Sequence, residues 1–183
     1  DPDGDTLTYS LSGIDASSMS INSSSGVLTF NSAPDYETKS SYTATVTTSD
    51  GTNSATQNIS VNVTNVNDNT PSITSGATFS AAENQTAIGT VVATDADSDI
   101  LTYSLSGTDA SSISISSTTG VLTFNSAPDY ETKTSYSATV TATDGTNSST
   151  QDITVTITDI DDTAPVFTSS ASFSAAENQT AIG

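Results

Sequence analysis

The chain has 183 residues, and its 21 acidic side chains against two basic ones give a formal net charge of −19 at pH 7. This balance repels nucleic acid phosphates and acidic membrane surfaces, so we expect cations as partners and no nucleic acid. The chain lacks both Cys and His, which excludes disulfide scaffolds, imidazole catalysis and most transition-metal sites. No apolar run approaches the roughly 20 residues of a membrane-spanning helix, so we expect no membrane insertion in this segment.

Short stretches in which apolar and polar residues alternate follow one another along the chain. In residues 134–144, every second residue from Tyr136 to Ala142 is apolar, which predicts a half-buried β-strand. In chain order, the predicted strands lie at residues 7–11, 19–21, 27–30, 42–48, 59–63, around 73, around 79, 88–92, 101–105, 113–115, 121–124, 134–144 and 153–157. The abundant Ser, Thr and Val disfavour helix. The predicted fold is therefore all-β, an antiparallel sandwich with about seven strands per unit.

The sequence repeats itself with a period of 94 residues. The heptapeptide Leu7–Gly13 recurs at Leu101–Gly107, and the nonapeptide Ala81–Gly89 recurs at Ala175–Gly183. A period of this length matches the size of one small sandwich domain. Each period is therefore predicted to be one domain.

Two Pro-containing segments, Asn65–Pro71 and Asp159–Pro165, are the predicted linkers between repeats. The resulting domains are a partial repeat at residues 1–70 that lacks its first strands, a complete repeat at 71–164, and the start of a third repeat at 165–183. A segment cut from a longer array of repeats would show this arrangement of one complete repeat between two partial ones, and this is the origin that we expect. The alternative is strand donation, in which the third segment of one chain supplies the strands that the first repeat of another chain lacks.

Acidic residues cluster where predicted strands end. In the second repeat they form the run Asp95-Ala-Asp97-Ser-Asp99, the turn Pro128-Asp129-Tyr-Glu131 and the pair Asp144-Gly145, with Glu83 near the end of an early strand. Each motif alone is weak, because Asp-Gly is a common turn and Asp-x-Asp is often a solvated loop. Together, alternate carboxylates and nearby carbonyl groups offer the oxygen ligands that suit Ca²⁺ better than Mg²⁺.

These motifs occur together in one known family. The chain resembles tandem cadherin repeats, and the matching motifs are Ala82-Glu83-Asn84, Asp95-Ala-Asp97, Pro128-Asp129-Tyr-Glu131, Ala142-Thr-Asp144-Gly145 and Asn65–Pro71. The resemblance covers essentially the whole chain and implies Greek-key, immunoglobulin-like sandwich repeats. It also implies Ca²⁺ ions between successive repeats, bound by the earlier repeat, the linker and the later repeat.

Carried over to this sequence, the resemblance implies a set of calcium ligands for each junction. At the first junction the implied ligands are Asp35, Glu37, the carbonyl groups of Val66 and Asn69, Asn67, Asp68, Asp95, Asp97 and Asp144. At the second junction they are Glu83, Asp129, Glu131, Asp161 and Asp162, and Glu177 matches Glu83 in the third repeat. The residues that match later-repeat ligands and would serve a preceding junction are Asp1, Asp3, Asp5 and Asp50.

Departures from the family pattern leave the number of ions per junction open. The turn Pro128–Glu131 lacks the usual Leu and Arg, and the linkers carry Asn65 and Thr163 where the family has Asp and Asn. The loop after Asp97 is shorter than in the animal proteins. It has no clear match for the Asn whose carbonyl completes one site.

The resemblance predicts a structural module outside the cell or at its surface, and not an enzyme. We expect calcium-binding repeats that form a rigid rod or stalk of an adhesin or surface fibre, and the near-identity of the repeats is similar to arrays in large microbial surface proteins. Expected partners are calcium, neighbouring repeats, like chains in a fibre, and a glycan or protein ligand at a distant tip. The alternative is a carbohydrate- or self-binding module in which Tyr36 or Tyr130 stacks on sugars, Tyr9 and Tyr103 being better suited to the core.

Overall fold

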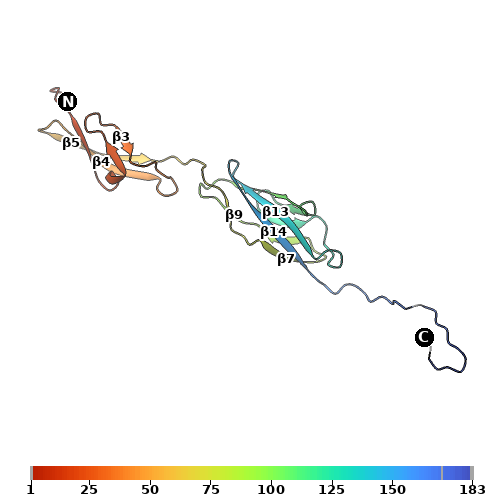
Figure 1. Ribbon diagram of the computed structural model, residues 1–183. Coiled ribbons are helices and arrows are strands. Elements are labelled where there is room, and N and C mark those ends of the chain that lie inside the picture. Colours follow the sequence, from red (N-terminus) through yellow and green to blue (C-terminus); the bar gives the residue numbers. More distant parts are fainter. Residues whose placement is uncertain (1, 170, 182–183) are drawn as a thin grey trace.

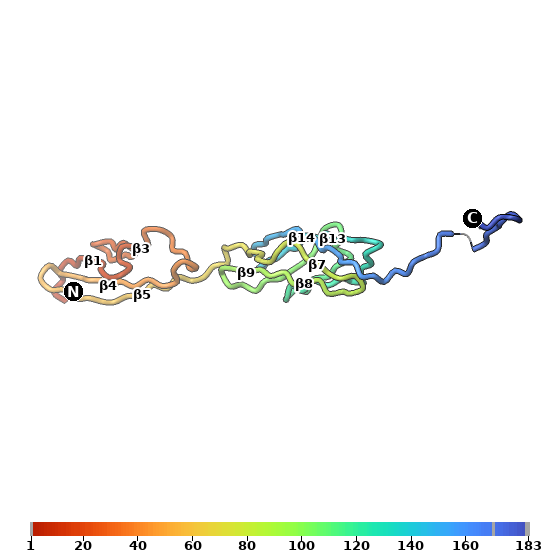
Figure 2. Tube along the Cα trace, turned by 90° about the horizontal axis from the view of Figure 1, so that it is seen from below, coloured from red at the N-terminus to blue at the C-terminus, as the bar shows by residue number. Residues whose placement is uncertain are grey.

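Two β-sandwich units lie end to end along one axis in the computed structural model, which describes residues 2–169 and 171–181 (Figure 1). The first unit contains β1 to β5, and the second contains β6 to β14. The segment of residues 63–71 connects them. Figure 2 shows that the long strands run along the axis of the molecule, so the turns between strands gather at the ends of each unit.

Three sheets make up the second unit. The largest has the order β10-β13-β14-β7, formed by Thr102–Ser106, Ser135–Thr143, Ser148–Thr158 and Thr78–Ala82. The next has the order β11-β12-β8, formed by Ile113–Ile115, Val121–Phe124 and Ala87–Thr90. The short strands β6 (Ser72–Ile73) and β9 (Ala93–Thr94) pair at the end that faces the first unit. The prediction of an all-β sandwich is thus confirmed.

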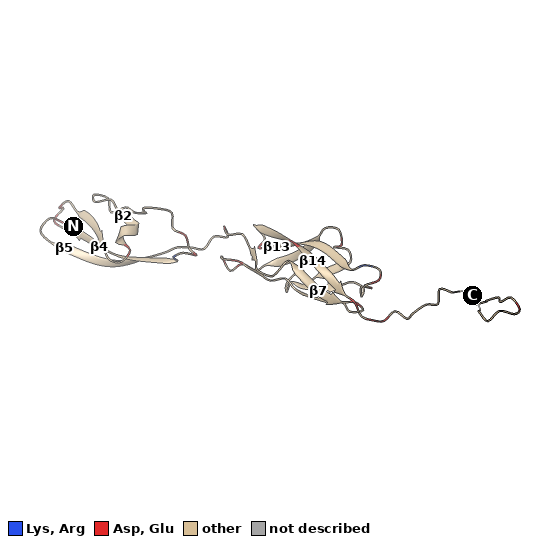
Figure 3. Cartoon of the chain, turned by 60° about the horizontal axis from the view of Figure 1, so that its bottom comes forward, with Lys and Arg blue, Asp and Glu red and all other residues tan. Residues whose placement is uncertain are grey.

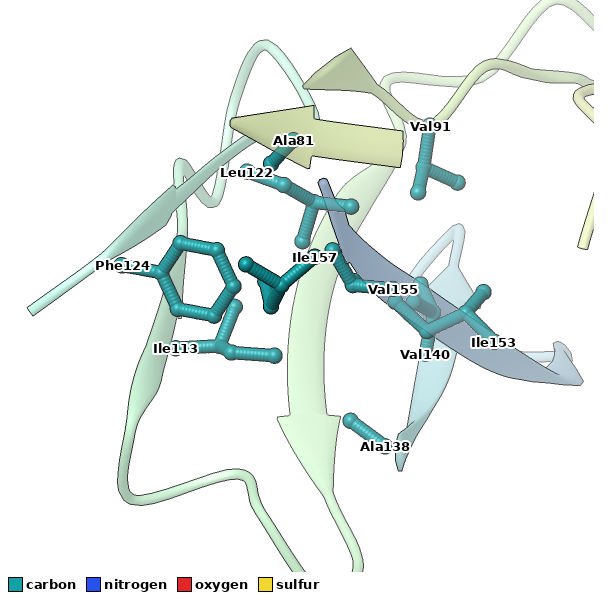
Figure 4. Packing of buried hydrophobic residues seen from close by; sticks show 10 residues of the cluster. All are labelled: Ala81, Val91, Ile113, Leu122, Phe124, Ala138, Val140, Ile153, Val155 and Ile157. Atoms are coloured by element: carbon teal, nitrogen blue, oxygen red, sulfur yellow. The ribbon is translucent and has the colours of Figure 1, made fainter. Parts of the chain in front are cut away.

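The core of the second unit lies between its two larger sheets (Figure 4). Alternate residues of β13 and β14 point inward, and Val140, Val155 and Leu122 of the facing strand β12 are fully buried. Burying an aliphatic side chain of this size stabilises a fold by about 1.5–3 kcal/mol. The period-2 pattern of the sequence therefore becomes the hydrophobic layer that holds the two sheets together.

Gly120 allows two strands to approach closely at the edge of this core. Its φ is +68°, and a Cβ atom placed on it would lie 2.1 Å from the carbonyl oxygen of Val91. In return, the Val91 N–H donates to the Gly120 carbonyl at 2.9 Å. Only glycine combines this backbone conformation with so close a contact.

One strand pair departs from the antiparallel pattern that the sequence predicts. β7 pairs with β14 in parallel, with Phe79 opposite Val155 and Ala81 opposite Ile157. The alternation of apolar residues gives the inward face of a strand but not its direction relative to a neighbour. Parallel pairing needs a long connection, and here β8 to β13 lie between β7 and β14 along the chain.

The first unit has fewer strands. Its sheet has the order β1-β4-β5, formed by Thr8–Ser12, Ser41–Ser49 and Ser54–Asn62, beside a hairpin of β2 (Met19–Ile21) and β3 (Leu28–Phe30). A 3-10 turn, η1 (Ala16–Ser18), precedes β2. Among the described residues, no strand pairs with β5 as β7 does with β14. Ile59 is therefore only half-buried, whereas the matching Ile153 is 1% exposed.

Residues 165–169 and 171–181 contain no strand. This stretch matches the sequence of β6 and β7, but its apolar side chains have no core to enter. Phe167 is 95% exposed and Val166 is 82% exposed. The segments that match β6 and β7 thus form no strand where no partner sheet lies beside them.

The two lysines of the chain occupy equivalent places in the two units. Lys133 Nζ lies 2.5 Å from Asp109 Oδ1 and 4.6 Å from the centre of the Tyr136 ring. The other carboxylate oxygen of Asp109 accepts a hydrogen bond from the Ser137 N–H at 2.8 Å. The hydrogen bond from Lys133 is the main cause of the lowered pKa of Asp109, and the Ser137 N–H lowers it further. Lys39 and Asp15 form the same ion pair in the first unit.

Candidate metal centre

The turns at the facing ends of the two units, together with the segment between them, carry a high density of carboxylates (Figure 3). At the centre of this region lies Asp97, in the turn after β9 and only 7% exposed. Its Oδ2 accepts hydrogen bonds from the backbone N–H groups of Asp68, at 3.2 Å, and Asn69, at 2.9 Å. Its backbone carbonyl accepts from Asn65 Nδ2 at 3.0 Å. The connecting segment is therefore folded around one buried carboxylate of the second unit.

Two groups of carboxylates share Asp97. In one group, oxygens of Glu37, Asp68 and Asp97 all lie within 4.8 Å of one another. In the other group, oxygens of Asp95, Asp97 and Asp99 meet the same limit. Two ligands on opposite sides of a Ca²⁺ ion, each at about 2.4 Å, are about 4.8 Å apart. The spacing in both groups is thus compatible with a shared cation.

The pKa values reflect this crowding. Partial burial raises the pKa of Glu37, and the neighbouring Asp97 carboxylate raises it further. The pKa of Asp97 is lowered, chiefly because the Asn69 N–H donates to it. Of the two, Asp97 is therefore the carboxylate that stays charged to lower pH. The repulsion between them is expressed in the raised pKa of Glu37.

Asp144 enters the same region from the turn between β13 and β14. Its Oδ1 accepts from the N–H groups of Thr146 and Asn147, both at 2.6 Å, as expected for an Asp-Gly turn. Although partial burial acts to raise it, these N–H groups lower the pKa of Asp144. The side-chain amide of Asn147 donates to Asn67 Oδ1 and to the Asn69 carbonyl, each at 3.1 Å. This turn is thereby tied to the connecting segment.

Two of these carboxylate oxygens are buried without a hydrogen-bond donor. They are Oδ2 of Asp95 and Oδ2 of Asp144, each with less than 1 Å² of exposed surface. A buried acceptor that lacks a partner costs about 1–3 kcal/mol, and more when it is charged. A cation that accepts several oxygen ligands removes that cost, and all the groups present here are oxygen donors. The residues of this junction therefore fit Ca²⁺.

A second acidic group lies at the far end of the second unit. Glu83 is 1% exposed, and its two oxygens accept from the N–H groups of Tyr130, at 2.8 Å, and Ile160, at 2.6 Å. Oxygens of Glu83, Glu131 and Asp159 lie within 4.8 Å of one another. The Glu131 backbone N–H lowers the pKa of that residue, but burial and the Glu83 and Asp159 carboxylates outweigh it, so the pKa is raised. This group repeats the crowding seen at the first junction.

The structure brings some of the implied ligands together and leaves others apart. Asp35 accepts from the Glu37 N–H and the Thr38 hydroxyl of its own turn, and Asp129 does the same with Glu131 and Thr132. The Thr38 hydroxyl is the main cause of the lowered pKa of Asp35. In this arrangement both aspartates shape the turn that presents the following glutamate.

The remaining implied ligands are dispersed. Asp162 accepts from Asn84 Nδ2 at 2.5 Å, whereas Asp161 and Glu177 lie on exposed segments. Val66 is 65% exposed within the connecting segment. Asp50 accepts from the Thr52 and Asn53 N–H groups at the other end of the first unit, where Asp3 and Asp5 also lie. Asp1 lies outside the described residues.

Two clustered carboxylates were absent from the implied ligands. Asp99 is part of the Asp95 run, and the alternating Asp-x-Asp-x-Asp pattern was the signal that could have found it. Asp159 is the first residue of the second linker, where the first linker has Asn65. Because the first linker has the amide Asn65 at this position, nothing in the sequence signalled that Asp159 would join a carboxylate group in the second linker.

Sandwich units in tandem, with carboxylates gathered where one unit meets the next, are typical of one class of extracellular adhesion repeat. The cadherin domain model matches residues 77–158. Protocadherin Fat 4 of Homo sapiens is 36% identical over 147 residues, and Protocadherin-16 of Mus musculus is 35% identical over 185 residues. These alignments cover 74% and 91% of this chain. The chain belongs to the cadherin family.

Solved structures agree with this assignment. The crystal structure of mouse cadherin-23 EC22-24 superposes with a TM-score of 0.75 at 26% identity, covering 85% of this chain and 53% of that one. The family consists of extracellular, cell-surface adhesion proteins without enzymatic activity, so these predictions from the sequence are confirmed. The chain spans only 3% and 6% of the length of the two curated relatives. No helix within the described ranges is long and apolar enough to cross a membrane.

Proposed function

We propose that the junction between the two units binds Ca²⁺ and that repeats joined in this way form a rigid extracellular rod, the stalk of an adhesin or surface fibre. The observation that carries the proposal is the position of Asp97, which belongs to both carboxylate groups while its backbone and side chain hold the connecting segment. The domain organisation that goes with it is a partial repeat at residues 1–70, a complete repeat at 71–164 and the start of a third at 165–183.

The residues of the junction act as a hinge whose stiffness depends on charge. Glu37 comes from the first unit, Asp68 from the connecting segment and Asp97 from the second unit, so their mutual repulsion drives all three parts away from one another. When bound, Ca²⁺ supplies the divalent positive charge that turns this repulsion into a link between the parts. The Asn69 and Asn147 amides hold the connecting segment in place for that link.

The proposed location of the module follows from the strength of such sites. Modules of this kind outside cells bind Ca²⁺ with dissociation constants of about 0.1–1 mM, and only extracellular calcium keeps them filled. The binding free energy is then added to the stability of the ordered junction.

The test is calorimetry and small-angle scattering of the 183-residue chain, with Ca²⁺ and then with EGTA. We expect calcium uptake and a larger, better-defined maximum dimension in the loaded state. Asp97→Asn should abolish both effects, because it removes the carboxylate common to both groups. Asp152→Asn is the matched control, since Asp152 is exposed, accepts a hydrogen bond from the Thr139 hydroxyl of the neighbouring strand, and has Asn58 as its counterpart in the first repeat. No calcium uptake by the wild-type chain would refute the proposal.

A second candidate function, self-binding by strand pairing, is favoured by the open edge of β5. β14 carries β7 at the matching edge, and residues 171–176 repeat almost the same sequence in an exposed segment. A synthetic peptide with the sequence of residues 71–90 should therefore bind this edge and raise the unfolding temperature of the first unit. A peptide with Phe79 replaced by Asp is the control, because that side chain packs against the core in the second unit. Equal effects of both peptides would exclude the pairing.

Glycan binding through tyrosine stays a prediction. Tyr103 packs against the core, and its hydroxyl accepts a hydrogen bond from the Ala93 N–H at 3.1 Å. Tyr130 also packs partly against the core, and Tyr36 is 38% exposed.

A further inference from the structure

Each unit has a pocket beside the loop that leads into its long central strand. In the second unit, the Phe124 pocket is lined by the turn before β11, the end of β12, the following loop and the start of β13, and its volume is about 340 Å³. In the first unit, the matching Phe30 pocket has a volume of about 420 Å³. Both volumes lie within the range of small-molecule sites, about 300–1,000 Å³.

The two pockets have the same lining. All ten residues that line the Phe124 pocket have an identical residue 94 positions earlier in the Phe30 pocket. A second pair of hollows lies where β1 and β10 end, and there four of the eight positions differ between the units, among them Ile14 against Thr108 and Asn58 against Asp152. The repeats have therefore diverged around one hollow and not around the other.

Hydrogen bonds within the chain preform both pockets. Asn125 Nδ2 donates to the Ser111 carbonyl at 2.8 Å, and Asn125 Oδ1 accepts from the Ser114 hydroxyl at 2.5 Å. Asn31 makes the matching bonds in the first unit. The two oxygens of Asp129 accept hydrogen bonds from its own turn. These side chains fix the loop, so their identity in the two units has a structural reason.

Other lining groups have no such structural task. Within the described part of the chain, the hydroxyl groups of Ser112 and Ser126 make no hydrogen bond, and neither do those of Ser18 and Ser32 in the first unit. Ser126 and Ser32 are also exposed. The fold does not require a hydroxyl group at these positions, yet both units carry one. These hydroxyl groups are therefore free to bind a ligand.

The chemistry of the lining favours a neutral sugar. The Phe124 and Tyr136 rings meet edge to face at 4.9 Å between centroids, and the matching rings of the first unit do the same. No lysine or arginine lines either pocket, and the chain has a net charge of −19, which disfavours an anionic ligand. A sugar ring has apolar C–H faces that suit an aromatic wall and hydroxyl groups that suit polar side chains.

We propose that the Phe124 pocket and the Phe30 pocket each bind one unit of a neutral saccharide, so that the repeats carry glycan sites along their length. The proposal does not depend on calcium binding, and it locates the sugar site away from the tyrosines at 36 and 130. The two units lie end to end, so one long polysaccharide or several short ones can engage both sites (Figure 1). Two weak sites on one chain then act together through their effective concentration.

The experiment is amide NMR titration of the 183-residue chain in EGTA with the methyl glycosides of glucose, galactose, mannose and N-acetylglucosamine. We expect at least one glycoside to shift the signals of residues 31–35 and 125–129. Ser126→Leu fills the Phe124 pocket and removes a free hydroxyl group, so the shifts at 125–129 should vanish while those at 31–35 persist. The double variant Ser32→Leu/Ser126→Leu should bind no glycoside. Thr108→Leu is the matched control, because Thr108 is exposed in the other hollow and has Ile14 as its counterpart.

The outcomes decide both the site and the class of ligand. If none of the four glycosides shifts these signals, the proposal is refuted. Binding by the double variant as strong as that of the wild type would refute it as well, and so would an equal loss of binding in Thr108→Leu. Methyl glucuronide is the anionic probe, and binding as strong as that of the neutral glycosides would overturn the class of ligand. Thermal unfolding shows whether the variants keep their fold, which we expect because Ser32 and Ser126 are exposed. All measurements are made in EGTA, so none of these results bears on calcium uptake.

Discussion

Replacing Glu83 by Gln tests the contribution of the carboxylate that is most deeply buried among the described residues. Glu83 is 1% exposed, and it accepts hydrogen bonds from the N–H groups of Tyr130 and Ile160. A glutamine keeps the volume but offers only one acceptor, so its NH₂ group faces one of these N–H groups. Hydrogen bonds to a charged group contribute about 1.5–3 kcal/mol each, and a buried unsatisfied donor costs about 1–3 kcal/mol.

We therefore expect Glu83→Gln to lower the unfolding free energy of the second unit by about 2–4 kcal/mol in EGTA. For a domain of this size, that corresponds to a fall in melting temperature of roughly 10 °C or more. The assay is thermal and urea unfolding of the 183-residue chain, followed for the transition of the second unit. Glu177→Gln is the matched control, because Glu177 occupies the same repeat position on an exposed segment. Surface changes of that kind stay within about 0.5 kcal/mol.

Equal stability of Glu83→Gln and the control would refute this reasoning. Since the measurement is made in EGTA, that result would mean that the two N–H groups find other acceptors when the carboxylate is removed. A loss of stability that appears only with Ca²⁺ would also contradict it, because the structural role of Glu83 would then depend entirely on the cation.

Two further predictions concern the core and the pH dependence of the junction. Ile153→Ala should lower the free energy of unfolding by about 2–5 kcal/mol, and Ile59→Ala should lower it clearly less, because Ile153 is 1% exposed while Ile59 is half-buried. The measurement is urea unfolding of both variants. Equal losses would contradict the prediction and show that the edge of β5 is covered. The raised pKa of Glu37 means that, without metal, the folded junction binds more protons than the unfolded chain above the ordinary value of 4.5, so its stability falls as pH rises through that window. Calcium competes with those protons, so its affinity should rise with pH over the same window, with protons released in calorimetry at pH 5; an affinity independent of pH would contradict this.

Local patterns were sufficient to predict the strands. Tyr136, Ala138, Val140 and Ala142 share a face in the sequence, and Ala138, Val140 and Ala142 are buried in β13. The pattern reports which face meets the core, which is a property of a few neighbouring residues. It contains no information on which distant strand lies alongside, so the parallel pairing of β7 with β14 could not be predicted.

The acidic site was predictable as a region but not residue by residue. Asp35 and Asp97 occur in similarly acidic motifs, yet Asp35 accepts from its own turn while Asp97 accepts from a segment almost 30 positions away. An Asp side chain can bond to backbone two residues on or to a distant donor, and sequence alone does not decide between them. The choice depends on which N–H groups the folded chain leaves without a partner.

The two linkers differ in a way that bears on how each junction is ordered. Asn65 and Asn69 of the first linker donate through their amides to Asp97, so they hold the segment in place even between like charges. The second linker has Asp159 and Thr163 at those positions, and a carboxylate at neutral pH has no proton to donate. There, Asp159 adds a third negative charge beside Glu83 and Glu131, whereas an amide would donate hydrogen bonds to them. The order of the first junction therefore rests partly on amide donors that the second linker lacks at the two matching positions.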